Sequence, residues 1–537
     1  MYHNPKALVP VPEDLFPGIA HHRLDEQNRM RSVIPAFHPL GARTPFKVLI
    51  YCDFRIYVIP SRLVHGFCGR DVRWFFSGAT RMLPKVFQAF IAASPVSVMV
   101  RGTLERTLRA ETLDRLFEET AEVQYVRELL FSECVHIMSD VVFRTSPSVC
   151  DWYRSHQDEM SVSRTAVYDK LAGTELNVSA EMVRRSADEL AAVRWKMKSL
   201  PRPLLRGYRT RVLDGTHLDG TEHRLLELRR YRAATLPGQA LLFYDPRLDL
   251  IDDVIPCEDA YTQERALTDQ FLQRVKPRDA IIVDRNFCTT KILFGTAARG
   301  AFFIVRQHKS TLTWESVGQE RRVGTDSKGR PIYVQKVRLT NPETKETMIV
   351  RRIRIPLKKP CRSGEKELFV LTNIPATDAD AVCIADRYTD RWTIEVAIQH
   401  LKGDLRCEID TLAYPKAALF GLCVALMAYN VVSLVKSALR VAHGKEFVED
   451  ELSMHYLTED VARTTGGMLI AIPQRHWSVF KKMSAPALAQ TLIELAARLK
   501  KHKYLKHKRG PKKKPPRKIS GKRNHHVSTA RLLEKRQ

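Results

Sequence analysis

The sequence lacks the marks of a secreted or zinc-clustered protein. Its ten cysteines form no CxxC pair, so we expect no zinc knuckle and a reduced, cytoplasmic setting. The N-terminus, from Met1 to Pro5, has no charged-then-apolar signal pattern. Long uncharged runs are scarce as well. Ala417 to Val435 is long enough to be mistaken for a membrane span, but it continues a helical pattern from Leu401. This pattern favours a buried core helix over a membrane protein.

Acidic residues are few relative to basic ones. The chain has 87 Lys and Arg against 60 Asp and Glu, which gives a net charge of +27. Its 537 residues suggest three or four domains. A hydrophobic fraction of 44% is enough for a sizeable core, which excludes wholesale disorder and collagen. The excess of positive charge predicts an acidic partner, either nucleic acid or an anionic membrane surface.

More than half of this charge lies at the C-terminal end. Arg498 to Gln537 carries 17 Lys and Arg against one acid, Glu534, for a net charge of +16. The stretch from Lys500 to Arg523 contains no acid, so we expect it to be disordered when free. Such a tail either grips the DNA backbone without reading sequence or serves as a solubilising extension.

Changes of pattern divide the chain into six segments. They are a mainly helical region at 1–205, an α/β region at 206–309, a β-strand insertion at 310–378, further helices of the α/β region at 379–443, a smaller helical region at 444–497, and a basic, disordered tail at 498–537. In the first segment Phe46–Tyr51 is strand-like, and Leu104–Leu130 has helical spacing. Ser163 would cap a helix reaching Leu171. That helix is either the DNA-recognising half of a helix-turn-helix or an ordinary capped helix.

Two short apolar strands each end in an aspartate. Arg211–Leu213 leads to Asp214, and Ala280–Val283 leads to Asp284. A carboxylate at a strand end is held rigidly at the rim of an α/β sheet, where functional groups commonly lie. Aspartate also starts turns and caps helices, so each one alone is weak evidence.

A third acid lies on a segment that we predict to be one helix, from Arg387 to Leu405. On a helical wheel Tyr388, Arg391, Glu395 and Lys402 share a stripe roughly 60° wide, and this stripe borders the apolar face. A merely solvated face has no reason to lie there. The alternative is that Arg391 and Glu395 form an i,i+4 pair that supports the helix.

Three carboxylates with few uncharged ligands beside them suit Mg²⁺ or Mn²⁺, because these ions prefer oxygen ligands. Two such ions can activate an attacking oxygen and stabilise a leaving one in phosphoryl transfer. Positive side chains beside the glutamate would then face the phosphate. A nucleic-acid phosphodiester therefore fits both the acidic cluster and the basic chain.

These residues resemble a known family. Tyr388-x2-Arg391-x3-Glu395-x6-Lys402 resembles the Y-R-E-K signature of the IS-four group of bacterial insertion-sequence transposases, which are DDE enzymes. The strands that end in Asp214 and Asp284 are similar to those that carry the family's two aspartates. The resemblance covers about residues 205–440. It implies an α/β fold with a ribonuclease-H-like, mixed-sheet catalytic core that contains a β-rich insertion and is flanked by helical N- and C-terminal regions.

The resemblance also implies a mechanism and partners. Asp214, Asp284 and Glu395 would be the catalytic residues and would bind two Mg²⁺ (or Mn²⁺) ions. By the same resemblance, Tyr388, Arg391 and Lys402 would contact DNA phosphates. The partners would be the terminal inverted repeats and target DNA, bound by a homodimer at the cytoplasmic nucleoid. Residues 1–205 would recognise the terminal repeats.

Several neighbouring residues have two interpretations. Trp314 either holds a flipped base, as in relatives that form a DNA hairpin, or packs in a core. His217 and Asp219 are candidates to support Asp214, and Trp392 is expected to pack. Three functions stay open: an active transposase, a catalytically inactive or domesticated DNA-binding protein, and a nuclease of the same fold.

Overall fold

The structure is a computed structural model. It describes residues 83–507 apart from 125–127, 309 and 361–363, together with residue 510, residues 526–535 and the backbone of two strands. These strands, β1 (Lys47–Cys52) and β2 (Arg55–Pro60), pair antiparallel, which confirms the strand expected at Phe46–Tyr51. The chain divides into two compact units, Met1–Phe75 and Phe76–Gln537. Strands β1 and β2 belong to the first unit, and the other described elements belong to the second.

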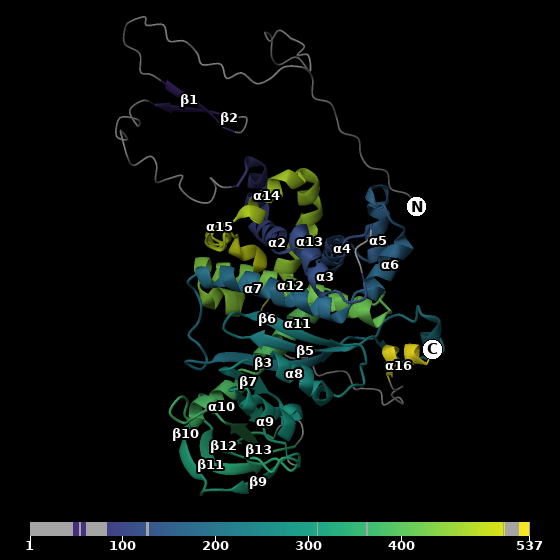
Figure 1. Ribbon diagram of the computed structural model, residues 1–537. Helices are drawn as coiled ribbons and strands as arrows, with labels where there is room; N and C mark the ends of the chain where they lie inside the picture. Colours follow the sequence, from purple (N-terminus) through teal and green to yellow (C-terminus); the bar gives the residue numbers. More distant parts are fainter. Residues whose placement is uncertain are drawn as a thin grey trace, which may run out of the picture. The chain divides into compact units, whose positions relative to one another are not determined.

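A ten-stranded mixed sheet forms the centre of the second unit (Figure 1). The strand order is β10-β11-β12-β13-β8-β7-β3-β5-β6, and β9 pairs with β11 off this path. Their bounds are β3 Arg209–His217, β5 Gln239–Asp245, β6 Leu250–Cys257, β7 Asp279–Val283, β8 Phe302–Arg306, β9 Thr313–Ser316, β10 Arg321–Thr325, β11 Pro331–Thr340, β12 Thr347–Pro356 and β13 Glu367–Thr372.

Five of these strands, β3, β5, β6, β7 and β8, form the mixed part of the sheet. Strands β3, β7 and β8 run parallel, whereas β5 is antiparallel to both β3 and β6. Parallel neighbours need crossover helices, and antiparallel neighbours need only short connections. The result is the mixed α/β sheet with flanking helices that we expected of a ribonuclease-H-like core.

The β-rich insertion extends the core sheet. Its last strand, β13, pairs antiparallel with the core strand β8, and β12 then pairs with β13. The hairpin predicted around Asn341 is confirmed, with Thr340 opposite Thr347 at its closed end. Because β8 directly follows the Asp284 segment in the sheet order, the insertion begins next to the predicted site.

Each face of the sheet is covered by its own helices. Alternation along β3 sends Val212 to one core and Leu213 to the other. The Leu213 core includes α8 (Thr268–Arg274) and α9 (Thr290–Ala298). The Val212 core is larger and includes α7 (Leu176–Lys196), α10 (Ala381–Thr389), α11 (Trp392–Gly403) and α12 (Pro415–His443).

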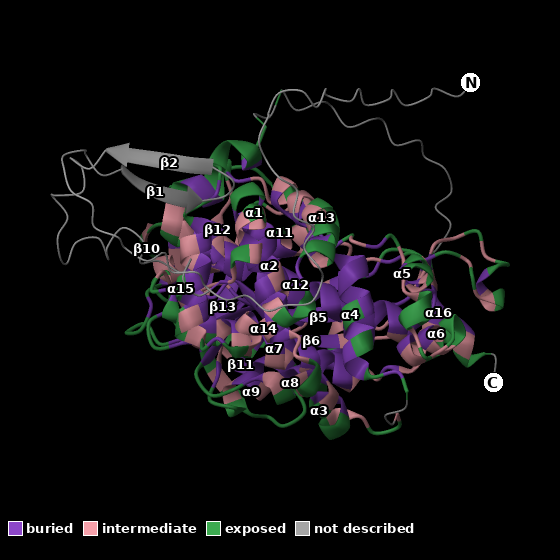
Figure 2. Cartoon of the chain, turned by 90° about the horizontal axis from the view of Figure 1, so that it is seen from above, coloured by how far each residue is buried: buried purple, intermediate pink, exposed green. Residues whose placement is uncertain are grey.

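Helix α12 is the predicted core helix. It is long and apolar enough to cross a membrane by length and composition, and its most apolar window is fully buried inside the protein. Figure 2 shows buried residues gathered around α12 and α4 (Phe131–Val142). The burial confirms that this run belongs to a protein core.

The N-terminal helical region precedes α7. Its helices are α1 Gln88–Ala93, α2 Pro95–Thr107, α3 Ala110–Thr120, α4, α5 Val149–Ser155 and α6 Arg164–Gly173. The helical spacing over Leu104–Leu130 corresponds to the end of α2 and to α3, which are separated by extended backbone at Arg109, and α3 ends at Thr120. The cap was predicted correctly, since Ser163 Oγ accepts a hydrogen bond from the Ala166 amide at the start of α6.

The C-terminal helical region contains α13 (Met454–Ala471), α14 (Gln474–Lys482) and α15 (Ala485–Ala496). The expected basic, disordered tail lies partly outside the described residues. Its described pieces are ordered, which corrects that expectation for them. Tyr504 is buried, and Val527–Ser528 forms β14, which pairs in parallel with β4 (Thr235–Leu236) and leads into α16 (Thr529–Glu534).

Candidate active site

The register of the sheet brings the two predicted aspartates together. Strands β3 and β7 are parallel neighbours, with Val212 opposite Ile282. Asp214 and Asp284 each lie two residues beyond that pair, so both reach the same end of the sheet on adjacent strands. Neighbouring strands lie about 5 Å apart. Burial and charge agree with this placement, since the charge of Asp284 acts on the pKa of Asp214.

Local hydrogen bonds fix both aspartates. Asp214 Oδ1 accepts from the Gly215 amide at 3.1 Å. Asp284 caps a short 3₁₀ helix, η8 (Arg285–Phe287), and its Oδ1 accepts from the Asn286 amide at 2.7 Å. Each carboxylate keeps a second oxygen for other partners. This arrangement orients the two acids toward the rim of the sheet.

Glu395 reaches the same site from α11 through Arg391. The guanidinium of Arg391 donates to Glu395 Oε1 at 2.6 Å and to Asp214 Oδ2 at 3.4 Å. The i,i+4 pair considered from the sequence therefore exists, but it also bridges to the first aspartate. Arg391 joins two of the three predicted catalytic acids.

The site holds more negative than positive charge. The pKa of Asp214 is raised from 3.8 to about 7, first by burial and then by the charges of Asp284, Glu264 and Glu395. Only Arg391 opposes these effects among the causes that act on Asp214. A carboxyl with such a pKa is partly protonated at neutral pH unless a cation joins the site.

Glu264 is a fourth acid of this site, and the sequence analysis did not single it out. It opens η7 (Glu264–Leu267), the 3₁₀ turn that leads into α8. Burial raises its pKa, Asp284 raises it further, and a hydrogen bond from the Asn286 side chain lowers it. Nothing in its sequence neighbourhood distinguishes Glu264 from an acid in the first turn of a helix.

The predicted single helix over Arg387–Leu405 is wrong, because α10 ends at Thr389 and α11 begins at Trp392. Around the break the amides bond three residues back, as from Arg391 to Tyr388. The hydroxyls of Thr389 and Thr393 compete for backbone carbonyls there. Tyr388 still lies beside the acidic site, since Arg391 and Asp284 both act on the pKa of its hydroxyl.

Tyr388 and Lys402 have partners inside the protein. Tyr388 is 8% exposed, and burial raises the pKa of its hydroxyl. The ammonium of Lys402 lies 2.5 Å from Glu408 Oε1 and 3.4 Å from Asp219 Oδ1, and it donates to the His217 carbonyl. These two residues flank the acidic site without reaching Asp214 or Asp284 through any hydrogen bond among the described residues.

The other residues considered from sequence take distinct positions. His217 and Asp219 contact Lys402 and make no described bond to Asp214. Trp392 was expected to pack but is 62% exposed. Trp314 lines a cavity of about 530 Å³, and the Arg352 guanidinium lies 4.9 Å from its ring.

The donor chemistry of the site fits a hard divalent cation. All four acidic groups offer carboxylate oxygens, which Mg²⁺ and Mn²⁺ prefer. Within the described part of the chain, no three His, Cys, Asp or Glu side chains lie close enough together, in their present positions, to hold one metal ion. The guanidinium of Arg391 bonds to both Asp214 and Glu395 instead. A cation would therefore compete with this guanidinium for the same oxygens.

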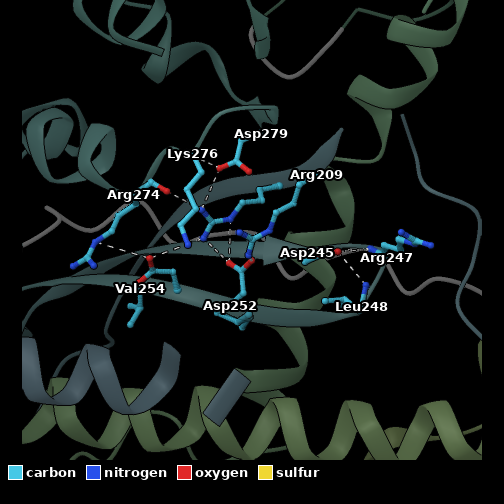
Figure 3. A network of polar contacts seen from close by, with 12 residues as sticks. Arg209, Asp245, Arg247, Leu248, Asp252, Val254, Arg274, Lys276 and Asp279 are labelled. Carbon is cyan, nitrogen blue, oxygen red and sulfur yellow. Dashed lines mark hydrogen bonds and ion pairs between the residues drawn. The ribbon is translucent and has the colours of Figure 1, made fainter. Parts of the chain in front are cut away.

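A separate ionic network holds the opposite end of β3 (Figure 3). Arg211 is buried and pairs with Asp252 at 2.6 Å, and its NH1 atom lies 3.8 Å from Asp279, the first residue of β7. Arg209 pairs with the same Asp252 at 2.5 Å. The network ties β3 to β6 and β7, so the strand that carries Asp214 is fixed at its start.

Three comparisons with known proteins were made, and one of them matches a family model. No curated protein matches the chain. A solved structure of the piggyBac transposase synaptic complex with hairpin DNA matches weakly, with 11% identity, a TM-score of 0.31, and coverage of 71% of this chain and 84% of that chain. A family model described as the transposase DDE domain matches residues 205–431, the segment that contains Asp214, Asp284 and Glu395.

Proposed function

We propose that the protein is the DDE transposase of a bacterial insertion sequence, which cuts DNA at transposon ends and joins the freed ends to target DNA. The observation that carries this proposal is the meeting of Asp214, Asp284 and Glu395 at one end of the sheet, within the segment that matches the transposase DDE domain. The three acids come from positions up to 181 residues apart in sequence, and only the fold brings them together.

The three acids would hold two Mg²⁺ or Mn²⁺ ions. When bound, these ions would activate an attacking oxygen and stabilise the leaving oxygen in an in-line displacement. The protein's own contribution is to fix the carboxylates: β3 and β7 set the separation of the two aspartates, and α11 delivers Glu395. Desolvation of Asp214 strengthens its attraction for a cation.

Arg391 would change partners when the site is loaded. Cations on Asp214 and Glu395 would release its guanidinium, which then faces the position of a DNA phosphate. Tyr388 and Lys402 would contribute further phosphate contacts, as the signature resemblance implies. Lys402 would have to exchange Glu408 and Asp219 for a phosphate.

DNA is the partner that fits the rest of the chain. The net charge of +27 favours a polyanion, and the basic run near the C-terminus supplies nine Lys and Arg side chains between Lys508 and Arg523. Paired transposon ends need two active sites, so we expect a homodimer on DNA. The protein would act in the cytoplasm, at the nucleoid.

Cleavage of the element's own ends tests this function. Purified full-length protein with Mg²⁺ should nick a duplex that carries its terminal repeat and should join the product to a plasmid. Asp214→Asn, Asp284→Asn and Glu395→Gln should each abolish both steps, whereas Asp269→Asn should leave them unchanged because Asp269 forms an exposed pair with Lys291.

The two other functions give different results in the same assay. Binding of the repeat without any metal-dependent cleavage would identify an inactive or domesticated DNA-binding protein. Cleavage without strand transfer would identify a nuclease of the same fold. Analysis of the cleaved ends would also separate hairpin from non-hairpin excision.

A further inference from the structure

The space beside Asp214 is filled by the carboxylate of Glu264. A Cβ atom added to Gly215 would lie 1.9 Å from Glu264 Oε1 and 2.7 Å from Glu264 Cδ. The backbone of Gly215 lies outside the left-handed region, so its conformation does not demand glycine. Gly215, which follows Asp214, is small because the Glu264 carboxylate approaches the strand at this position.

Glu264 is also connected to the second aspartate. The side chain of Asn286 donates a hydrogen bond to the Glu264 carboxylate. The backbone amide of the same Asn286 donates to Asp284 Oδ1 at 2.7 Å. One residue thus links Glu264 to the turn that orients Asp284, while the Glu264 carboxylate lies against the strand of Asp214.

This placement adds a third carboxylate beside the two aspartates. Glu264 is partly buried, and the charges of Asp284 and Asp214 lie close to it. No Lys or Arg is among the groups that act on its pKa in the described part of the chain. A carboxylate added to two others without a positive partner raises the energy of all three ionised forms. A divalent cation bound between the carboxylates turns this repulsion into attraction for the cation.

We propose that Glu264 is a positioning residue of the acidic centre, which holds the turns of Asp214 and Asp284 in place and raises the affinity of the centre for divalent cations. This inference rests on the proposed function, because it assumes that the centre binds metal. The alternative role of Glu264 is to stabilise the start of η7 and α8, because an acid is favourable beside a helix N-terminus. The proposed role is different from that one.

Direct Mn²⁺ binding to the full-length protein tests the inference without any activity assay. Glu264→Gln keeps the length of the side chain and an acceptor for Asn286, but removes the charge. We expect it to weaken Mn²⁺ binding about tenfold or more in calorimetric titration, the size of effect seen for groups that support metal ligands. Gly215→Ala should weaken it in the same direction, because the new methyl group displaces Glu264.

Stability of the metal-free protein separates this role from a structural one. Removal of the surplus charge should leave the thermal midpoint of Glu264→Gln unchanged or raise it, although Mn²⁺ affinity falls. A structural role predicts the opposite pattern, a lower midpoint with unchanged affinity. Asp269→Asn, on the adjoining α8, is the matched control and should change neither quantity.

The outcomes distinguish this inference from the proposed function. Wild-type binding that Asp214→Ala abolishes, together with unchanged binding by Glu264→Gln, overturns the inference alone. A Glu264→Gln protein that fails to fold without metal also overturns it, because charge removal is expected not to destabilise. Wild-type protein that binds no Mn²⁺, or binds it equally after Asp214→Ala, overturns both the inference and the proposed metal centre.

Discussion

Arg391 bridges Asp214 and Glu395, with its guanidinium 3.4 Å from Asp214 Oδ2 and 2.6 Å from Glu395 Oε1. One cation therefore balances two of the acids that the sequence predicts to be catalytic. The remaining negative charge of the site comes from Asp284 and Glu264. This bridge balances part of the negative charge of the acidic cluster.

Replacement of Arg391 should make the protein depend on metal for its stability. Arg391→Ala leaves the acids without their guanidinium and should cost about 2 kcal/mol of unfolding free energy, the scale of hydrogen bonds to charged groups. Addition of Mg²⁺ should recover more stability in this variant than in the wild type. Urea unfolding with and without Mg²⁺ measures both quantities. An equal response of the two proteins to Mg²⁺ would contradict the account.

Metal binding should depend on pH through Asp214. Its pKa is raised from 3.8 to about 7, so below about pH 7 a cation must displace a proton. Mn²⁺ affinity should fall as the pH drops below 7, and calorimetry in buffers of different ionisation enthalpy should detect proton release.

The raised pKa of Asp214 also makes the stability of the protein depend on pH. Asp214 stabilises the metal-free protein most at low pH, and this contribution is lost as the pH rises through about 7. Mn²⁺ affinity that stays constant from pH 6 to 8 would exclude this role for Asp214.

A buried ion pair should hold the sheet to α12. Asp249 accepts hydrogen bonds from Tyr244 and Tyr429 and pairs with Lys436 and Arg440 at 3.0 and 3.1 Å. Lys436 and Arg440 lower the pKa of Asp249 despite its burial. Asp249→Asn should therefore cost about 3–5 kcal/mol, because both cations lose their buried counter-charge.

An exposed pair provides the control for Asp249. Glu222→Gln breaks the Arg224–Glu222 pair, in which both side chains are half exposed, and should change stability by less than about 1 kcal/mol. Chemical unfolding of the two variants and the wild type compares them. Similar small losses in both would show that the Asp249 cluster adds little to stability.

The basic run should set the salt dependence of DNA binding. Glutamine at the nine Lys and Arg positions from Lys508 to Arg523 removes the charge and leaves the rest of the chain unchanged. Each lost phosphate contact should flatten the log–log slope of affinity against salt by about 0.9. Binding to unrelated sequences should weaken as much as binding to the terminal repeat. An unchanged slope would identify the run as a solubilising extension.

The last residues of the chain should be docked through Asp259. This carboxylate accepts from Ser528 Oγ at 2.7 Å and from Arg531 Nε at 2.8 Å. Asp259→Ala should release β14 and α16, so that the Val527 amide exchanges with solvent faster. Hydrogen exchange measures this effect. Arg463→Ala removes an exposed i,i+4 pair on α13 and should leave Val527 protection unchanged.

The sequence pattern is enough to single out three acids that the fold then brings near one another. Asp284 directly follows the apolar strand β7, as predicted, whereas the strand expected to end at Asp214 continues to His217, so Asp214 lies within β3. Local patterning detects such apolar strands but not their exact ends. Glu395 was found through its spacing from Tyr388, Arg391 and Lys402. The buried helix α12 was also predictable, because a 19-residue run without charge is informative by itself.

The contacts between these elements were not predictable from sequence. The approach of Glu264 to Gly215 joins residues 49 positions apart, and the Arg391–Asp214 bond spans 177 positions. Local periodicity carries no information about such pairs. The break between α10 and α11 was missed because Thr389 and Thr393 act through backbone hydrogen bonds that a helical wheel ignores.

The most direct test of the central claim is Mg²⁺-dependent cleavage of the element's own terminal repeat by Asp214→Asn, Asp284→Asn and Glu395→Gln proteins whose folding and DNA binding match the wild type. We expect the wild type to cut and join the repeat with Mg²⁺ but not with excess chelator, and each variant to bind the repeat without cutting it. Cleavage that persists in any one of the three variants would contradict the assignment of that acid to the active site.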